Sequence, residues 1–340
     1  MSTTPTIVSE DDFLCLVDEY FPVDSPHQLL TRGDDCAELA MPGEIAMSSD
    51  LFLEDVHFRT GYFSYSEIGH KALAVNLSDL AAAGAIPLGF NMNLMLPKTT
   101  PRVQIKEFLK GMSKLAAEYE LPLIGGDLSG GGKLGVCITV WGKKAGKRFL
   151  RRGECSPGDH IFLLSENGTH QLGLARAGLT ALEKLGRENA IKDFPQASAA
   201  HLTPTPLLKL GAKLAQLDPH ASLMDLSDGL ARDLPRLLGW SQAKTGLGAE
   251  LELAESSLSP ELIEFSRRFG LSPLNEAVLG GEDYILLGTC KNAGVIERLG
   301  KDSDCLAKII GEVNGNSVTL NRQPLTAGGF DHFNPPVLLG

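Results

Sequence analysis

A basic stretch without hydrophobic periodicity begins at about residue 143 and separates this 340-residue chain into two halves. It reads KKAGKRFLRRGECSPGDH, and its glycines, proline and charges are typical of a connector between domains. In both halves strand and helix patterns alternate, but without the regular βαβ rhythm of a doubly wound parallel sheet. The sequence therefore predicts an α+β protein of two domains, residues 1–145 and residues 146–340.

Apolar spacing and turn residues predict the elements of the first half. Ser9 is expected to cap a first helix over residues 10–20. Two short apolar runs on either side of a Pro-Gly turn at residues 42–43 predict a hairpin. Ser66 is expected to cap a helix that ends near Gly84. The remaining expectations are a strand over 88–97, a helix over 101–119, a buried strand that ends at Gly125 and Gly126, and a strand that ends near Gly142.

The second half begins with an apolar strand, HIFLLS, directly after the connector. The elements expected after it are helices over 171–184 and 205–217, the strand ASLMDLS, a helix after Gly229, and strands near 249–253, 284–290, 306–312 and 317–321. This half is therefore also expected to mix helices and strands.

The charge balance limits the partners of the chain. Asp and Glu number 42 against 31 Lys and Arg, which gives a formal net charge of −11. No dense run of Lys and Arg provides the positive surface that nucleic acid or an anionic membrane attracts. A phosphate group bound by this chain is therefore expected to need metal ions as mediators.

Cysteine spacing and the N-terminal segment bear on the cellular compartment. No two of the six cysteines are separated by two to four residues, so neither a zinc knuckle nor a redox CxxC is indicated. The N-terminus is acidic and amphipathic, unlike a signal peptide, and no uninterrupted apolar stretch reaches about 18 residues. We expect a cytoplasmic protein with reduced thiols and no membrane contact.

The sequence lacks the common signatures of nucleotide and hydrolase sites. It contains no GxxxxGK[ST] loop, supports no dinucleotide-binding fingerprint, and has neither GxSxG nor HExxH. Aspartates beside glycine or serine recur instead, in the segments Gly33-Asp34-Asp35, Ser48-Ser49-Asp50, Asn76 to Asp79, Gly125-Gly126-Asp127 and Asp225 to Gly229. Each segment alone is consistent with a turn or a helix cap, and Asp228 with an N-cap, but together they favour a shared function.

Asp79 gives this interpretation its strongest support. It falls within an otherwise apolar, Ala-rich helical pattern, where an unpaired carboxylate would be costly to bury. Mg²⁺ suits such a position, because it prefers carboxylate and water oxygens and bridges aspartates to nucleotide phosphates. A bound cation also relieves the repulsion among clustered carboxylates. The alternative is that Asp79 faces solvent.

Several other side chains are candidates for binding an anion or a ring. They are Arg148, Arg151 and Arg152 in the connector, His57 after the Ser-Ser-Asp segment, Glu282 in a glycine turn, and Phe330 beside glycines near the C-terminus. The arginines suit a phosphate and the aromatic ring suits an aromatic ligand. A solvated linker, ordinary packing and a tight turn are the alternatives.

These segments, in this order and approximate spacing, resemble thiamine-monophosphate kinases, members of the aminoimidazole-ribonucleotide-synthetase-like superfamily of ATP-dependent enzymes. The matching segments are GDDCAEL, the Ser-Ser-Asp strand end with its following VHF, KALAVNLSDLAAAGA, LIGGD, DLSDGL, GGEDY and FDHF. They span nearly the whole chain, and several occur across the superfamily. The segment of His57, the form of GGEDY and the FDHF ending favour the thiamine branch.

The resemblance implies phosphorylation of thiamine monophosphate to thiamine diphosphate by direct in-line transfer of the ATP γ-phosphoryl group, assisted by several Mg²⁺ ions and without a covalent enzyme intermediate. It implies a homodimer in which the N-terminal domain binds ATP and Mg²⁺ and forms a shared β-barrel, while the C-terminal domain closes over the nucleotide and substrate. The implied residues are Asp35, Ser48, Ser49, Asp50, Asp79, Asp127, Asp225 and Asp228 for metal, Gly126, Asp127, Arg152 and Ser227 for ATP, and His57, Glu282 and Phe330 for thiamine monophosphate.

Two alternatives remain open at this stage. One is another enzyme of the same superfamily that acts on a carboxylate, an amide or selenide. The selenide branch is disfavoured because Cys15 lies in a helical pattern and not in a glycine-rich segment. The other is a nucleotide-binding protein without catalysis, against which the intact set of aspartates argues.

Overall fold

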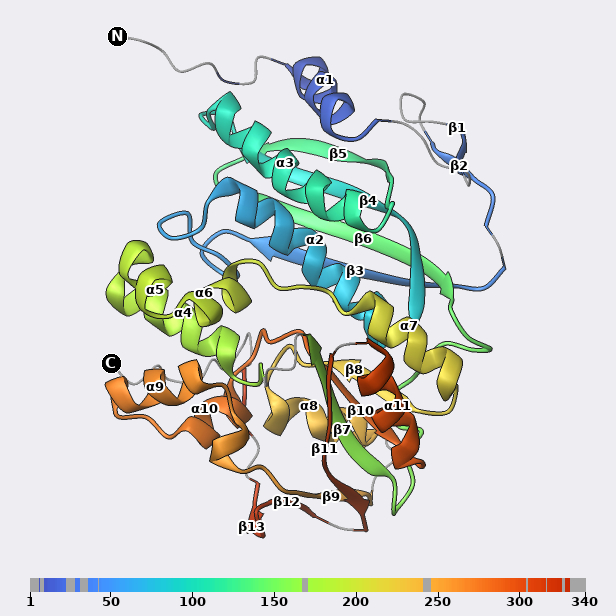
Figure 1. Ribbon diagram of the computed structural model, residues 1–340. Helices are drawn as coiled ribbons and strands as arrows, with labels where there is room; N and C mark the ends of the chain where they lie inside the picture. Colours follow the sequence, from blue (N-terminus) through green and yellow to red (C-terminus); the bar gives the residue numbers. More distant parts are fainter. Residues whose placement is uncertain are drawn as a thin grey trace. The chain divides into compact units, whose positions relative to one another are not determined.

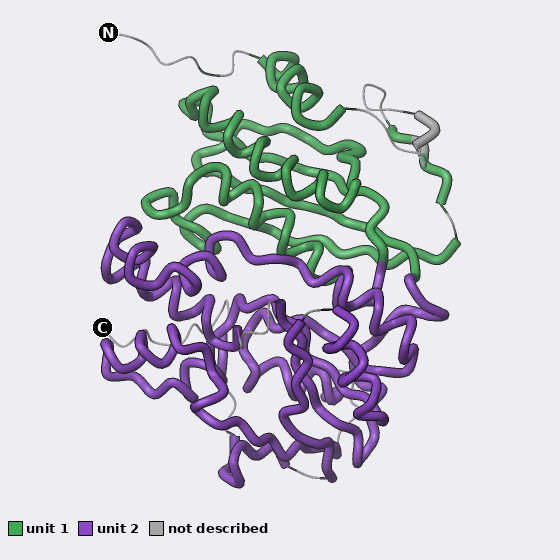
Figure 2. Tube along the Cα trace, viewed as in Figure 1, with its two compact units in different colours: residues 1–80, 86–144 green, residues 81–85, 145–340 purple. Residues whose placement is uncertain are grey.

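The computed structural model describes residues 6, 9–22, 28–30, 36–41, 43–166, 171–240, 246–303, 305–315, 317–325 and 328–330. Helices and strands are mixed throughout these residues, so the fold is α+β (Figure 1). The chain splits into two compact units, Met1–Leu80 with Ile86–Lys144 and Ala81–Ala85 with Ala145–Gly340 (Figure 2).

The elements follow one another in a mixed order. They are α1 (Glu10–Tyr20), β1 (Gln28–Leu30), β2 (Glu38–Leu39), β3 (Ile45–Leu53), α2 (Tyr65–Ala82), β4 (Ala85–Pro97), α3 (Arg102–Glu118), β5 (Leu123–Gly131), β6 (Gly135–Lys144), β7 (His160–Glu166), α4 (Leu174–Leu185), α5 (Arg187–Asp193), α6 (Pro195–Leu202), α7 (Leu208–Leu217), β8 (Ser222–Asp225), α8 (Leu230–Leu237), β9 (Gly248–Leu251), α9 (Pro260–Phe269), α10 (Pro273–Leu279), β10 (Leu286–Cys290), α11 (Ala293–Ser303), β11 (Cys305–Asn314), β12 (Val318–Leu320) and β13 (Gln323–Pro324).

A four-stranded mixed sheet in the order β3-β6-β4-β5 forms the centre of the first unit. β3 and β6 are antiparallel in unbroken register, from Ile45 opposite Lys143 to Leu53 opposite Gly135. β4 and β5 are parallel. Because side chains alternate along a strand, Ser48 and Asp50 share one face of β3 and Ser49 lies on the other.

Helices α2 and α3 pack closely against each other on the same side of this sheet (Figure 1). Two glycines allow the contact, since a Cβ atom at Gly69 would lie 2.0 Å from the carbonyl oxygen of Phe108, and one at Gly111 would lie 1.9 Å from that of Ser66. A substitution at either glycine would therefore push the two helix backbones apart.

The ends of α1 and α2 are fixed by short polar side chains. Ser9 accepts a hydrogen bond from the Asp12 N–H at 3.1 Å, which confirms the expected cap of α1. The cap expected at Ser66 is wrong, because Ser64 and Glu67 form a reciprocal capping box two residues earlier. The Glu67 carboxylate accepts the Ser64 N–H at 2.8 Å, and the Ser64 hydroxyl accepts the Glu67 N–H at 3.3 Å.

Two strand predictions in the first unit are wrong. The hairpin expected around residues 42–43 is not formed, because β2 pairs with β1 while β3 pairs with β6; Pro42 itself lies outside the described residues. β5 does not end at its glycines but continues to Gly131 beside β4. Gly126 has φ +154°, and a Cβ there would lie 1.8 Å from the Met92 carbonyl oxygen, so only glycine fits this approach.

A seven-stranded sheet in the order β13-β12-β9-β11-β7-β10-β8 forms the centre of the second unit. All the described pairings in it are antiparallel except that of β12 with β9. β10 and β8 are buried along their whole length, and Ser222, Asp225 and Thr289 are buried polar residues within them. The sequence did not predict the helices α5, α6, α9, α10 and α11, which cover seven to eleven residues each.

The cysteines and the hydropathy of the helices bear on the expectations about thiols and membranes. All six cysteines are free, as their spacing predicted. None of the helices in the described residues has both the length and the hydropathy needed to cross a bilayer.

Candidate active site

An acidic group in the first unit lies where β3 faces α2. The Ser48 hydroxyl donates a hydrogen bond to Asp79 Oδ2 at 2.5 Å. The Asp50 N–H donates to Asn76 Oδ1 at 3.1 Å, and the buried Asn76 side chain is itself held by the Ala72 carbonyl oxygen. The 3.6-residue period of α2 thus turns Asn76 and Asp79 toward the strand that carries Ser48 and Asp50.

The electrostatics of this acidic group favour a cation. Burial raises the pKa of Asp50 to about 6, and the neighbouring Asp79 carboxylate contributes further because two like charges repel. Within the described ranges, no three side chains of His, Cys, Asp or Glu lie together as a metal-binding group. The donors that do converge are carboxylate and hydroxyl oxygens, which fit Mg²⁺ when water and phosphate complete its coordination.

The other residues expected around this metal are distributed differently. The Ser49 hydroxyl lies on the opposite face of β3, where it contacts Thr139 Oγ1 at 2.9 Å, so its side chain is not brought to Ser48 and Asp50. Asp127 is exposed on β5, the other edge of the sheet, three strand spacings of about 4.8 Å from β3. Gly126 precedes it on the same edge strand. Asp35 lies outside the described residues.

His57 follows β3, and the hydrogen bond to one of its ring nitrogens is defined. Its Nδ1 accepts a hydrogen bond from the Leu53 N–H at 3.1 Å, and its ring stacks on Phe52 with 5.9 Å between the ring centroids. Since Nδ1 is the acceptor, a neutral imidazole carries its proton on Nε2. A neutral His57 therefore has its N–H group at Nε2, and an anion accepts a hydrogen bond from such a group.

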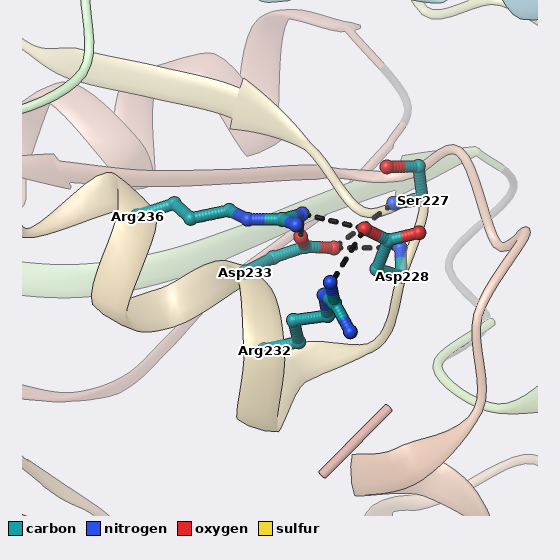
Figure 3. A network of polar contacts seen from close by, with 5 residues as sticks. All are labelled: Ser227, Asp228, Arg232, Asp233 and Arg236. Carbon is teal, nitrogen blue, oxygen red and sulfur yellow. Dashed lines mark hydrogen bonds and ion pairs between the residues drawn. The ribbon is translucent and has the colours of Figure 1, made fainter. Parts of the chain in front are cut away.

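A second acidic group, in the second unit, lies between β8 and the first turns of α8 (Figure 3). Asp233 is fully buried and accepts the N–H groups of Ser227 at 3.1 Å and Asp228 at 2.8 Å. Arg236 bridges the two carboxylates, at 2.6 Å from Asp228 and 2.8 Å from Asp233, and Arg232 Nε lies 3.5 Å from Asp228. Burial raises the pKa of Asp233, while the N–H donors and Arg236 favour its charged form.

Backbone hydrogen bonds bring Glu282 and Phe330 to the same turn. The Glu282 N–H donates to the Ser227 carbonyl oxygen at 2.8 Å, and the Phe330 N–H donates to that of Asp228 at 3.0 Å. Asp225 lies just before this turn, buried at the end of β8. Five of the residues expected in the site, which come from three separate segments of the chain, are thus neighbours in the second unit.

Three further side chains hold this region and were not predicted. Asp283 is buried and accepts the N–H groups of Gly173 at 2.6 Å and Ala175 at 3.1 Å; burial raises its pKa to about 8. His201 Nδ1 lies 3.0 Å from Glu282 Oε2. Asp233 is the third, and its signal was available, since an acidic residue in the first helical turn after a Ser-Asp-Gly turn is a ready acceptor for that turn's N–H groups.

The connector arginines have separate environments. Arg148 forms an ion pair with Glu154. Arg152 is half-buried, and the N–H of its neighbour Gly153 donates to the Leu237 carbonyl oxygen at 2.8 Å. This bond places Arg152 beside the end of α8, the helix that carries Asp233 and Arg236. Arg151 is exposed.

Comparisons with known proteins identify the class of α+β proteins to which this fold belongs. The family described as AIR synthase related protein, N-terminal domain, matches residues 33–143. A thiamine-monophosphate kinase from Stenotrophomonas maltophilia has a similar structure, with TM-score 0.75, 28% identity, and coverage of 92% of this chain and 96% of that one. A structure named AaThiL complexed with AMPPCP and TMP gives TM-score 0.73 at 25% identity, covering 96% and 97%.

Sequence relatives give the particular family. The thiamine-monophosphate kinase of Synechococcus elongatus is 32% identical over 344 residues, which cover 96% of this chain and 97% of the relative. That of Buchnera aphidicola is 31% identical, covering 90% of this chain and 93% of the relative. The chain belongs to the thiamine-monophosphate kinase family, as its motifs predicted.

Proposed function

We propose that this chain is an enzyme that transfers the γ-phosphoryl group of ATP to thiamine monophosphate, giving thiamine diphosphate and ADP. The observation that carries the proposal is the turn at Ser227 and Asp228, whose two carbonyl oxygens accept the N–H groups of Glu282 and Phe330. A carboxylate and an aromatic ring beside an acidic turn suit a ligand that has a cationic ring at one end and a phosphate at the other. Membership of the family and the likeness to the AMPPCP and TMP complex support the same assignment.

The substrate contacts follow from the chemistry of each side chain. Glu282 would pair with the positively charged thiazolium ring, and Phe330 would pack against the ring system. His57 would donate its Nε2 proton in a hydrogen bond to the phosphate, since its Nδ1 already accepts one from Leu53. Gly126, Asp127, Arg152 and Ser227 are proposed to contact ATP.

Mg²⁺ is proposed to bind at the acidic group of each unit. The residues that would hold it are Ser48, Asp50, Asp79, Asp127, Asp225 and Asp228, with Ser49 through its main chain and Asp35 from outside the described residues. When bound, Mg²⁺ supplies positive charge that offsets the charge of the transferring phosphoryl group. The donor oxygens of Ser48, Asp50 and Asp79 are consistent with that ion.

The chain's own residues would position two phosphate groups that repel each other. In-line transfer needs the acceptor oxygen and the leaving oxygen on opposite sides of the γ-phosphorus, so orientation is the main contribution of the protein. Asp233 and Arg236 fix the Ser227 and Asp228 turn in advance, which reduces the reorganisation needed during reaction. No covalent enzyme intermediate is required.

A homodimer is proposed through the β3 side of the sheet face that lies opposite α2 and α3 in the first unit. α2 and α3 lie on one face, while the other carries exposed apolar side chains on β3: Met47 is 69% exposed and Leu51 is 57% exposed. Apolar surface of this kind favours association. A second copy paired here would form the shared barrel, with residues 1–145 binding ATP and Mg²⁺ and residues 146–340 closing over the ligands.

An assay of the purified protein tests the proposed function. With ATP, Mg²⁺ and thiamine monophosphate, we expect equal amounts of thiamine diphosphate and ADP, measured by chromatography. Omitting thiamine monophosphate provides the control for simple ATP hydrolysis. Binding of an ATP analogue without formation of thiamine diphosphate would contradict the thiamine substrate and favour another phosphoryl acceptor.

A further inference from the structure

A buried histidine contacts the carboxylate of Glu282. His201 lies in the last turn of α6 and is 1% exposed, whereas Glu282 is 28% exposed. The distance from His201 Nδ1 to Glu282 Oε2 is 3.0 Å. This contact therefore joins a side chain inside the second unit to one that reaches its surface.

The main chain of Glu282 is already fixed without His201. Its φ angle is +65°, a left-handed conformation that is uncommon for a residue with a side chain. Its N–H donates to the Ser227 carbonyl oxygen at 2.8 Å, and the next residue, Asp283, is bound to the N–H groups of Gly173 and Ala175. The freedom that remains to Glu282 is in the torsions of its side chain.

We propose that His201 is a positioning residue that fixes the Glu282 carboxylate for the cationic part of thiamine monophosphate; this rests on the proposed function. The Nδ1–H of His201 donates to Oε2 and restricts the side-chain torsions. Glu282 then loses less conformational entropy when the substrate binds. Because His201 is shielded from water, the hydrogen bond competes little with solvent.

A positioning role and a purely structural role of His201 differ in which KM values change. A histidine that only ties α6 to the turn at Glu282 would change stability, or the binding of both substrates. A histidine that positions Glu282 would change the KM for thiamine monophosphate and leave the KM for ATP nearly constant. The split between the two KM values therefore separates the two roles.

Three variants of α6 provide the test. His201→Leu keeps an apolar volume but removes the donor, and we expect the KM for thiamine monophosphate to rise about tenfold and the KM for ATP to change by less than about twofold. His201→Asn keeps an N–H donor near the position of Nδ1 and should restore most of the affinity. Ser198→Ala is the matched control, since Ser198 is equally buried on the same helix and its hydroxyl has no hydrogen-bond partner among the described residues.

Two results would overturn the proposal. One is an equal rise of both KM values in His201→Leu; the other is a lower thermal midpoint with both KM values unchanged. If the leucine variant does not fold, the wild-type protein gives a second measurement: the Nδ1–H resonance of His201, assigned with His201→Asn, should shift when thiamine monophosphate is added without ATP. Absence of that shift at saturating substrate also overturns it.

These measurements distinguish an error in the positioning role of His201 from an error in the proposed kinase function. A wild-type protein that forms no thiamine diphosphate contradicts the function. An active enzyme whose KM for thiamine monophosphate is insensitive to His201→Leu contradicts only the positioning role.

Discussion

The carboxylates of the two acidic groups have neighbours of different charge. In the first unit Asp50 and Asp79 face each other, and the proximity of Asp79 adds to the effect of burial in raising the pKa of Asp50 to about 6. In the second unit Asp228 and Asp233 are also close, but Arg236 lies between them and Arg232 beside them (Figure 3). The second group thus carries its own positive charge, whereas the first contains two like charges and is the group at which we propose that Mg²⁺ binds.

Because of this difference, we expect the two groups to have different roles. Carboxylates that repel one another in the folded protein gain most when a divalent cation binds. Carboxylates paired with arginine contribute to the stability of the fold, because removing one partner leaves the other charge buried. Substitutions of Asp50 and Asp79 in the first group should therefore act on activity, and substitution of the buried Asp233 in the second group should act on stability.

The largest effect is expected from Asp50→Asn in the first group. The variant keeps the shape of the side chain but loses the charge, so kcat/KM should fall at least about 100-fold at ordinary Mg²⁺ concentrations. The free energy of unfolding without Mg²⁺ should not decrease, since the repulsion with Asp79 is gone. Steady-state assays and urea unfolding measure the two quantities. Activity within a few-fold of the wild type would refute a metal-binding role.

A stability effect is expected from Asp233→Asn in the second group. The substitution places an NH₂ group where one of the two oxygens stood, so either the Ser227 and Asp228 N–H groups or Arg236 face a donor in place of an acceptor, at an expected cost of about 3 kcal/mol. Urea unfolding measures it. Glu264→Gln is the control, because Glu264 pairs with Arg267 on the exposed surface and should show no measurable change. Equal stability of the two variants would remove the contrast drawn between the groups.

A smaller, pH-dependent effect is expected from Asp283, a third carboxyl that has backbone N–H groups in place of arginine. Its pKa of about 8 in the folded state exceeds the ordinary value of 3.8, so the protonated carboxyl group stabilises the folded protein. This stabilisation is complete below pH 3.8 and is lost as the pH rises through 8. Between pH 6 and pH 8 the loss is about 2 kcal/mol. The free energy of unfolding of Asp283→Asn, measured with urea at several pH values, should lack this part of the pH dependence. If the free energy of unfolding depends on pH in the same way in the wild type and in Asp283→Asn, the pKa of Asp283 lies near its ordinary value.

Local sequence predicted much of the candidate site. The positions of Asp225, Ser227 and Asp228 at the end of an apolar strand and before a helix followed from patterns a few residues long. The Ser9 cap and the helix that carries Asp79 were predicted for the same reason. These features depend on neighbours within one or two turns of the chain.

Long-range contacts account for what local patterns missed. The strand that pairs with β3 is β6, nearly a hundred residues later, and no local turn signal encodes that choice. The contact between His201 and Glu282, and that between Asp283 and Gly173, likewise join segments that only the folded chain brings together.

The sequence by itself determined the kinds of side chain available, the α+β class and the family, because these are written in residue types, periodicity and the order of motifs. The tertiary structure decided which aspartates face one another and which face arginine. It did so because burial and charge depend on the distance between atoms in space, which strand pairing and helix packing set across the whole chain.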